Sequence, residues 1–80
     1  MYLEIITPDK KIFEGEINLV QLPGSKGSFT MLKNHAPIIS TLEKGTITVK
    51  EISGQEHVFN INGGVVENVA DKVIVLVESA

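Results

Sequence analysis

Hydrophobic and polar residues alternate along this chain in short runs, and each run ends at a cluster of turn-forming residues. Alternation with a period of two is typical of β-strands, and no window repeats apolar residues at helical spacing for long. The pattern predicts strands at residues 3–7, 12–22, 28–32, 38–42, 46–52, 57–61, 65–69 and 73–77. Strands at such regular spacing indicate an all-β fold, a two-sheet antiparallel β-sandwich or flattened barrel, with residues 1–80 as one domain.

Two of these strands depart from simple alternation. In the run 12–22, the apolar side changes phase at the adjacent residues Leu19 and Val20, and Gly15 lies inside the run. A β-bulge, or a bend from one sheet into another, explains both features. The five apolar residues at 73–77 cannot alternate in polarity, so we expect this strand to be buried on both faces, by a second sheet and a crossing loop or by another protein.

Composition limits the classes of function. A chain of 80 residues with 42% apolar and 21% charged residues is globular, but its core is small, and without cysteine it has neither disulfides nor thiolate zinc sites. The net charge of −3, with all cations being scattered lysines, argues against nucleic-acid binding and against an anionic membrane surface. No segment approaches the ~20 apolar residues of a membrane span. We therefore expect a cytoplasmic protein that approaches a membrane only through another protein.

Residues able to catalyse a reaction or bind a metal are few. His35, Asp71 and Ser28 could form a triad only by chance, and His57 is expected on the solvent side of its strand. Acidic residues fall mainly in turns and at strand ends, without metal-ligand spacing. We predict no catalytic residue, no metal and no cofactor.

The segment 24–28 contains glycine, lysine and serine, as phosphate loops do. In a P-loop, however, the lysine follows the last glycine and a helix follows the loop. Here Lys26 precedes Gly27 and a strand is predicted next. The segment is interpreted as an ordinary exposed turn.

The segment 32–39 is open to two interpretations. Pro37 forces Ala36 into an extended conformation, so the loop has a defined shape. Ile38 and Ile39 could both be core residues, with His35 capping a turn. Alternatively, because neighbouring residues of a strand face opposite sides, one isoleucine fills the core while the other remains free for a partner.

Four blocks of sequence, in this order and spacing, resemble the epsilon subunit of rotary ATP synthases, which is called delta in mitochondria. They are TPD with FEGE at 7–9 and 13–16, PGSKGSF at 23–29, NHAPII at 34–39, and GGVVE at 63–67. The resemblance spans nearly the whole chain. It departs from the family pattern at Thr30 and Lys33, where glycine and proline are commoner, and at Ser28, where some members have an acid.

The resemblance implies a non-catalytic β-sandwich that rotates with the central stalk of a proton- or sodium-translocating ATP synthase, at the cytoplasmic face of a bacterial membrane. It implies binding to the gamma subunit and to the c-ring, without nucleotide bound by this domain. By position, the gamma-facing residues are His35, Ala36, Pro37, Ile38, Ile39 and Thr41. The residues expected near the c-ring are Ser25, Lys26, Gly27 and Ser28. Many members continue into a carboxy-terminal helical hairpin, and this sequence resembles the short form without it.

Two alternatives remain open from the sequence. A biotinyl or lipoyl carrier domain is also a β-sandwich of this size, and Lys33 in Met31-Leu32-Lys33 is its only candidate attachment site. An unrelated interaction module could use the same fold, because a fold does not determine function.

Overall fold

The computed structural model describes residues 1–34 and 36–79, which form eight strands and no helix. Their bounds are β1 Tyr2–Ile6, β2 Lys11–Gly24, β3 Gly27–Leu32, β4 Ile38–Leu42, β5 Gly45–Glu51, β6 Glu56–Ile61, β7 Gly64–Val69 and β8 Lys72–Val77. Each predicted strand is present, with ends that differ by at most two residues. The all-β prediction is confirmed.

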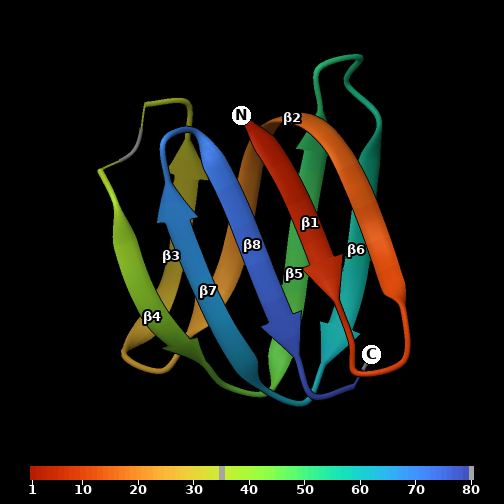
Figure 1. Ribbon diagram of the computed structural model, residues 1–80, viewed down its shortest axis with the longest axis vertical. Helices are drawn as coiled ribbons and strands as arrows, with labels where there is room; N and C mark the ends of the chain where they lie inside the picture. Colours follow the sequence, from red (N-terminus) through yellow and green to blue (C-terminus); the bar gives the residue numbers. More distant parts are fainter. Residues whose placement is uncertain (35, 80) are drawn as a thin grey trace.

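The strands form two layers (Figure 1). One layer, in front in that view, holds β4, β7, β8, β1 and the start of β2, and the other holds β3, the end of β2, β5 and β6. Every strand pair is antiparallel except β1 with β8, which is parallel. The bridge between Gly24 and Leu42 connects β2 with β4, so the strands β2, β1, β8, β7 and β4 close into a flattened barrel.

Strand β2 belongs to both layers. It pairs with β1 up to Glu16 and with β5 from Ile17, and the β5 register shifts between Ile17 and Leu19. The shift leaves Asn18 as the extra residue, so both Ile17 and Val20 point into the core. The predicted bulge and bend are confirmed. Gly15 plays no part in them, because it pairs regularly with Leu3.

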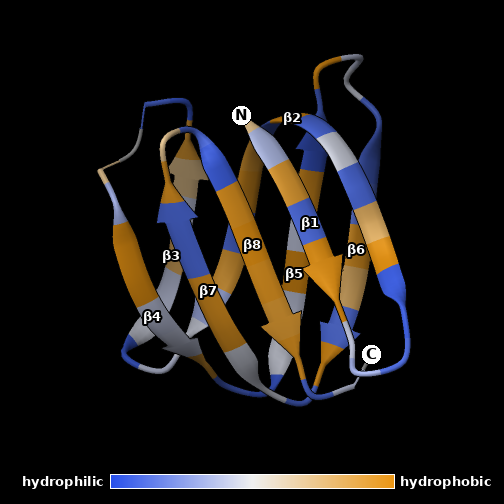
Figure 2. Cartoon of the chain, in the orientation of Figure 1, coloured by the Kyte–Doolittle hydropathy of each residue, from blue (hydrophilic) through white to orange (hydrophobic). Residues whose placement is uncertain are grey.

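The core lies between the layers. Figure 2 shows that hydrophobic positions run through strands of both layers. Fully buried side chains are contributed by β1, β2, β3, β5, β7 and β8, and the largest are Leu3, Ile5, Ile17, Leu22, Met31 and Ile47. Inward and outward residues alternate along most strands, as expected for sheets with one covered face.

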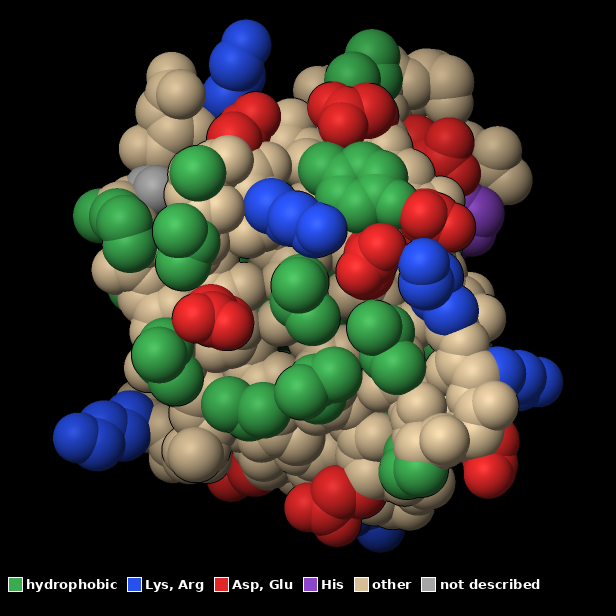
Figure 3. Space-filling model, viewed as in Figure 1, with side chains coloured by type: hydrophobic (Ala, Val, Ile, Leu, Met, Phe, Trp, Pro, Cys, Tyr) green, Lys and Arg blue, Asp and Glu red, His purple; other side chains and the backbone are tan. Residues whose placement is uncertain are grey.

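The prediction that residues 73–77 are buried on both faces is wrong within this chain. Val73, Val75 and Val77 are buried, but Leu76 is 49% exposed and Ile74 is half-buried. The reason is that β8 lies inside the front layer, between β7 and β1, where only its inner face meets the second layer. Coverage of the outer face by another protein stays a prediction. Figure 3 shows hydrophobic side chains spread over this outer face, with acidic and basic ones among them.

Candidate functional site

The segment expected to face gamma begins in the loop before β4 and continues along that strand. Ala36 and Pro37 are exposed, and His35 lies outside the described residues. Ile38 is partly buried and packs against the core, whereas Ile39 is 73% exposed. The opposite orientation of the two isoleucines, expected from strand alternation, is confirmed. The interpretation in which both are core residues is wrong.

A side chain that sequence reasoning missed holds this loop. Asn68 of β7 is 2% exposed, and its amide Nδ2 donates to the carbonyl oxygen of Ala36 at 3.3 Å. Asn68 also pairs across the ladder with Ile38, the first residue of β4. The signal was available in the sequence, because Asn68 occupies an inward position two residues after the buried Val66. A polar side chain at such a position needs a hydrogen-bonding partner.

The turn expected near the c-ring joins β2 to β3, and Ser25, Lys26, Gly27 and Ser28 are all exposed. Gly27 has φ of 126°, which a residue with a Cβ rarely adopts. Gly24, in contrast, belongs to β2 and pairs with Gly27. A strand follows the turn, so the arrangement of a phosphate loop before a helix is not present.

The two predicted contact regions adjoin each other. Thr41 Oγ1 donates to Ser25 Oγ at 2.9 Å, and the backbone N–H of Ser25 donates to the carbonyl oxygen of Thr41 at 3.0 Å. Thr41 belongs to the gamma-facing set and Ser25 to the c-ring set. A single corner of the barrel therefore carries both regions, one on strand β4 and the other on the β2–β3 turn.

Ile39 lies between two shallow grooves. The larger, about 490 Å³, separates β3 from β4 and is lined by Lys26, Gly27, Phe29 and Thr41 as well as Ile39. The smaller, about 350 Å³, lies on the β7 side and includes Pro37 and Val69. An exposed isoleucine flanked by grooves on both sides is suited to contact a protein surface.

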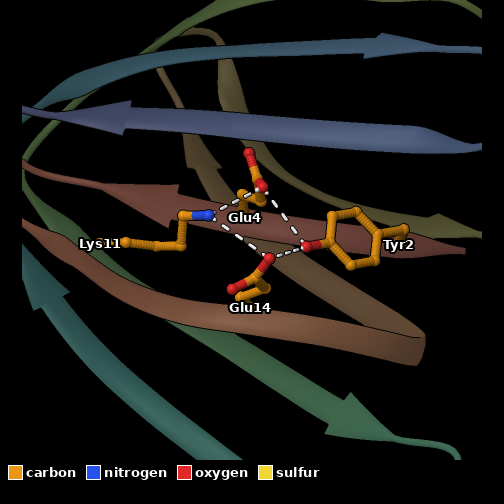
Figure 4. A network of polar contacts seen from close by, with 4 residues as sticks. All are labelled: Tyr2, Glu4, Lys11 and Glu14. Atoms are coloured by element: carbon orange, nitrogen blue, oxygen red, sulfur yellow. Dashed lines mark hydrogen bonds and ion pairs between the residues drawn. The ribbon is translucent and has the colours of Figure 1, made fainter.

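A polar cluster that the sequence did not predict lies across β1 and β2 (Figure 4). The Tyr2 hydroxyl donates to the carboxylates of Glu14 and Glu4, and Lys11 Nζ lies 3.1 Å from Glu4 and 3.3 Å from Glu14. The hydrogen bond from Tyr2, with that from Lys11, holds the pKa of Glu14 below its usual range. The hydrogen bond to Glu14 and burial raise the pKa of Tyr2, and the bond to Glu4 raises that of Lys11.

The cluster has a structural explanation. Glu4 and Glu14 face each other directly across the β1–β2 ladder, where two like charges destabilise a sheet. Lys11 and Tyr2 compensate by binding both carboxylates. We therefore assign this cluster to the pairing of β1 with β2 rather than to chemistry.

The other residues considered for chemistry are separated or engaged. Ser28 is the second residue of β3 and Asp71 lies in the β7–β8 turn, at opposite ends of the barrel (Figure 1). The prediction that His57 lies on the solvent side of its strand is wrong: it pairs with the buried Val49, and its ring bonds to the Glu51 carboxylate and lies 5.2 Å from the ring of Phe13. Within residues 1–34 and 36–79, no three His, Asp or Glu side chains are placed to hold a metal. In the same part of the chain, no helix could cross a bilayer.

The fold is shared with subunits of rotary ATP synthases. A chain of the mitochondrial ATP synthase of Euglena gracilis, solved with OSCP, F1 and the c-ring, superposes with a TM-score of 0.87 over 94% of this chain and 48% of its own, at 21% identity. A chain of the central stalk and c-ring of the Tetrahymena thermophila enzyme superposes with a TM-score of 0.80 over 99% and 63%, at 17% identity. At identities this low, the superpositions show that this chain has the same β-sandwich fold, which defines its structural class.

Sequence similarity identifies the family within that class. Residues 1–80 match the family described as ATP synthase, Delta/Epsilon chain, beta-sandwich domain, and the chain belongs to this family. It is 36% identical to the ATP synthase epsilon chain of Caulobacter vibrioides, over all of this chain and 92% of that protein. It is 42% identical to the epsilon chain of Chlorobaculum tepidum, over 95% and 86%.

Relatives differ in how far they extend beyond this domain. The epsilon chain of Desulfatibacillum aliphaticivorans is 41% identical over 98% of this chain, yet only 55% of that relative is covered. The chain thus spans about half the length of some relatives and nearly all of others. Epsilon chains are not the catalytic subunits of the synthase, and family membership leaves the carrier-domain alternative without support.

Proposed function

We propose that this chain is a rotor subunit of a proton- or sodium-translocating ATP synthase, joining the gamma subunit to the c-ring. In this proposal, His35, Ala36, Pro37, Ile38, Ile39 and Thr41 form the gamma-facing segment, with Ile38 supporting it from the core side. Ser25, Lys26, Gly27 and Ser28 form the turn that approaches the ring. The complex would lie at the cytoplasmic face of a bacterial membrane, and this domain would bind no nucleotide.

The observation that carries the proposal is the 73% exposure of Ile39 beside its neighbour Ile38, which is partly buried and packs against the core. An exposed isoleucine alone is ordinary on a protein surface. Here it stands on a loop and strand that Pro37 and the Asn68–Ala36 hydrogen bond pre-shape, so little ordering entropy is lost on docking. Rigid apolar anchors with grooves beside them are typical of protein interfaces.

The adjacency of the two contact regions also supports the proposal. A subunit that joins a shaft to a ring must touch both near the place where they meet. Two hydrogen bonds between Ser25 and Thr41 hold the β2–β3 turn against β4. A load on the gamma-facing strand would therefore be transmitted directly to the turn that faces the ring. The exposed Lys26 amine and the serine hydroxyls suit the polar surface of ring loops.

Copurification tests this function. Tagged wild-type chain should bring down gamma and c subunits from cells that make the complete synthase. Ile39→Asp should lose gamma by placing an unpaired carboxylate in the interface, with a fold unchanged by circular dichroism. Val58→Asp is the matched control, because Val58 is also an exposed apolar strand residue, at 58%, but lies on β6 in the other layer. Normal gamma recovery with Ile39→Asp would refute the assigned surface.

A further inference from the structure

Strand β4 has one paired edge and one largely open edge. It pairs with β7 along its whole length, from Ile38 to Leu42. On the other edge, the only bridge among residues 1–34 and 36–79 is between Leu42 and Gly24. That bridge is closed by two hydrogen bonds, from Ser25 N–H to the Thr41 carbonyl at 3.0 Å and from Glu43 N–H to the Pro23 carbonyl at 2.9 Å. Among the described residues, no strand pairs with this edge before Thr41.

These bonds determine which backbone groups are offered to a partner. Because the Thr41 carbonyl points toward Ser25, it points away from β7. In an antiparallel ladder, residues two apart direct their N–H and C=O groups to the same side. The N–H and C=O of Ile39 therefore also point away from β7, toward the open edge, while Ser40 bonds on the β7 side. A substitution that removes the N–H of Ile39 would therefore not break any hydrogen bond between β4 and β7.

The open edge faces a groove of mixed polarity, in which the apolar side chains of Phe29 and Ile39 lie beside Lys26 and hydroxyl-bearing residues. Phe29 of β3 lines the groove of about 490 Å³ together with Ile39 and Thr41. Natural proteins protect exposed strand edges with charged side chains, proline or bulges. Residues 38–42 carry no charge and pair with β7 without a bulge. Pro37, which lacks an N–H, precedes the strand and limits pairing only at that end. The edge is thus left open where the exposed isoleucine stands.

We propose that the gamma subunit docks by adding an extended segment to the open edge of β4, with main-chain hydrogen bonds to Ile39. This inference rests on the proposed function, which assigns the segment to gamma, and it adds the mode of recognition. Residues 37–41 span roughly 13 Å of strand, enough for a partner segment of about four residues. A second copy of this chain is a poorer occupant, because both copies carry a net charge of −3 and repel each other.

Amide hydrogen exchange on the full chain, alone and bound to the gamma subunit of the same synthase, tests the proposal directly. The Ile39 amide should exchange rapidly in the free protein and slow by about 100-fold or more in the complex, as expected for a newly formed ladder bond. Unchanged exchange at Ile39 in a saturated complex would overturn the proposal. So would protection confined to β3, or protection of Ile39 by self-association in the absence of gamma.

A proline pair provides the second test. Ile39→Pro removes the edge N–H without removing a β4–β7 bond, and should lower gamma affinity at least tenfold. Val58→Pro is the control. Glu51 N–H donates to the Gln55 carbonyl, so Gln55 and the residues at even spacing from it along β6 bond to β5. Val58 lies at odd spacing from Gln55, and its N–H therefore also points to an open edge. This variant should bind gamma normally. If Ile39→Pro binds as tightly as wild type while Ile39→Asp does not, strand addition is wrong and the proposed function stands.

Discussion

The buried amide of Asn68 donates to the carbonyl oxygen of Ala36, 32 residues earlier in the chain. This hydrogen bond ties the loop before β4 to strand β7, which is the partner of β4 in the front layer. The loop of the proposed gamma surface is therefore positioned by the core of the barrel rather than by its own sequence alone.

Asn68→Ala should lower the free energy of unfolding by about 1–3 kcal/mol, because it removes a hydrogen bond and leaves space in the core. Urea unfolding measures the change. Gamma affinity should fall as well, because the loop is no longer held in its docking conformation. An unchanged affinity would show that the loop keeps its shape without Asn68.

Aspartate at the two isoleucines of β4 should separate stability from binding. Ile38→Asp should unfold or strongly destabilise the domain, because a carboxylate would enter the core cluster that Ile38 packs against. Ile39→Asp should change the urea midpoint only slightly, since that side chain is 73% exposed. Equal loss of stability in both variants would contradict the orientation of the strand.

Two glycines should respond oppositely to alanine. A Cβ at Gly64 would lie 2.3 Å from the backbone oxygen of Leu76, so Gly64→Ala must push β7 away from β8. We expect a loss of about 2–3 kcal/mol. At Gly15 the nearest atom is 3.9 Å away, on the Phe13 side chain. Gly15→Ala should be neutral or stabilise by about 0.5 kcal/mol, by reducing the freedom of the unfolded chain. Chemical denaturation of both variants checks the contrast.

The cluster in Figure 4 predicts a specific titration. Tyr2→Phe removes the hydrogen bond that lowers the pKa of Glu14, so that pKa should rise toward its ordinary value of 4.5. Because the folded pKa is lowered, the stability that Glu14 contributes is present above about pH 4.5 and is lost as the pH falls through the folded pKa. The stability difference between wild type and Tyr2→Phe should therefore shrink in acid.

Carboxyl NMR of Glu14 measures the pKa directly. Lys50→Gln serves as the control, since it removes a positive charge on β5, outside the cluster. The pKa of Glu14 in the Lys50→Gln variant should match that in the wild type. A Glu14 pKa that does not move in Tyr2→Phe would show that Lys11 alone maintains the shift.

Strand positions could be predicted from the sequence because the signals that specify them are local. Alternating residues and turn clusters located all eight strands, and the adjacent apolar pair at Leu19 and Val20 indicated the bulge that the structure places at Asn18. The same alternation placed Ile38 and Ile39 on opposite faces. Each of these inferences depends only on residues within a few positions of one another.

Other features depended on residues far apart in the chain. The sequence could not show that β1 runs parallel to β8 or that Gly24 meets Leu42 to close the barrel, because pairing depends on how distant strands come together. The apolar run at 73–77 was misinterpreted for the same reason: β-branched residues favour a strand whether or not both faces are covered.

The sequence by itself determined which segments are strands, where they turn and to which family the chain belongs, since those properties are written in local pattern and motif. Only the tertiary structure decided that Thr41 meets Ser25, that Asn68 holds Ala36 and that the edge of β4 stays open beside Phe29. These relationships join residues far apart in the chain. They form only when the two layers pack together, because the folded arrangement decides which strands become neighbours and which strand edges remain unpaired.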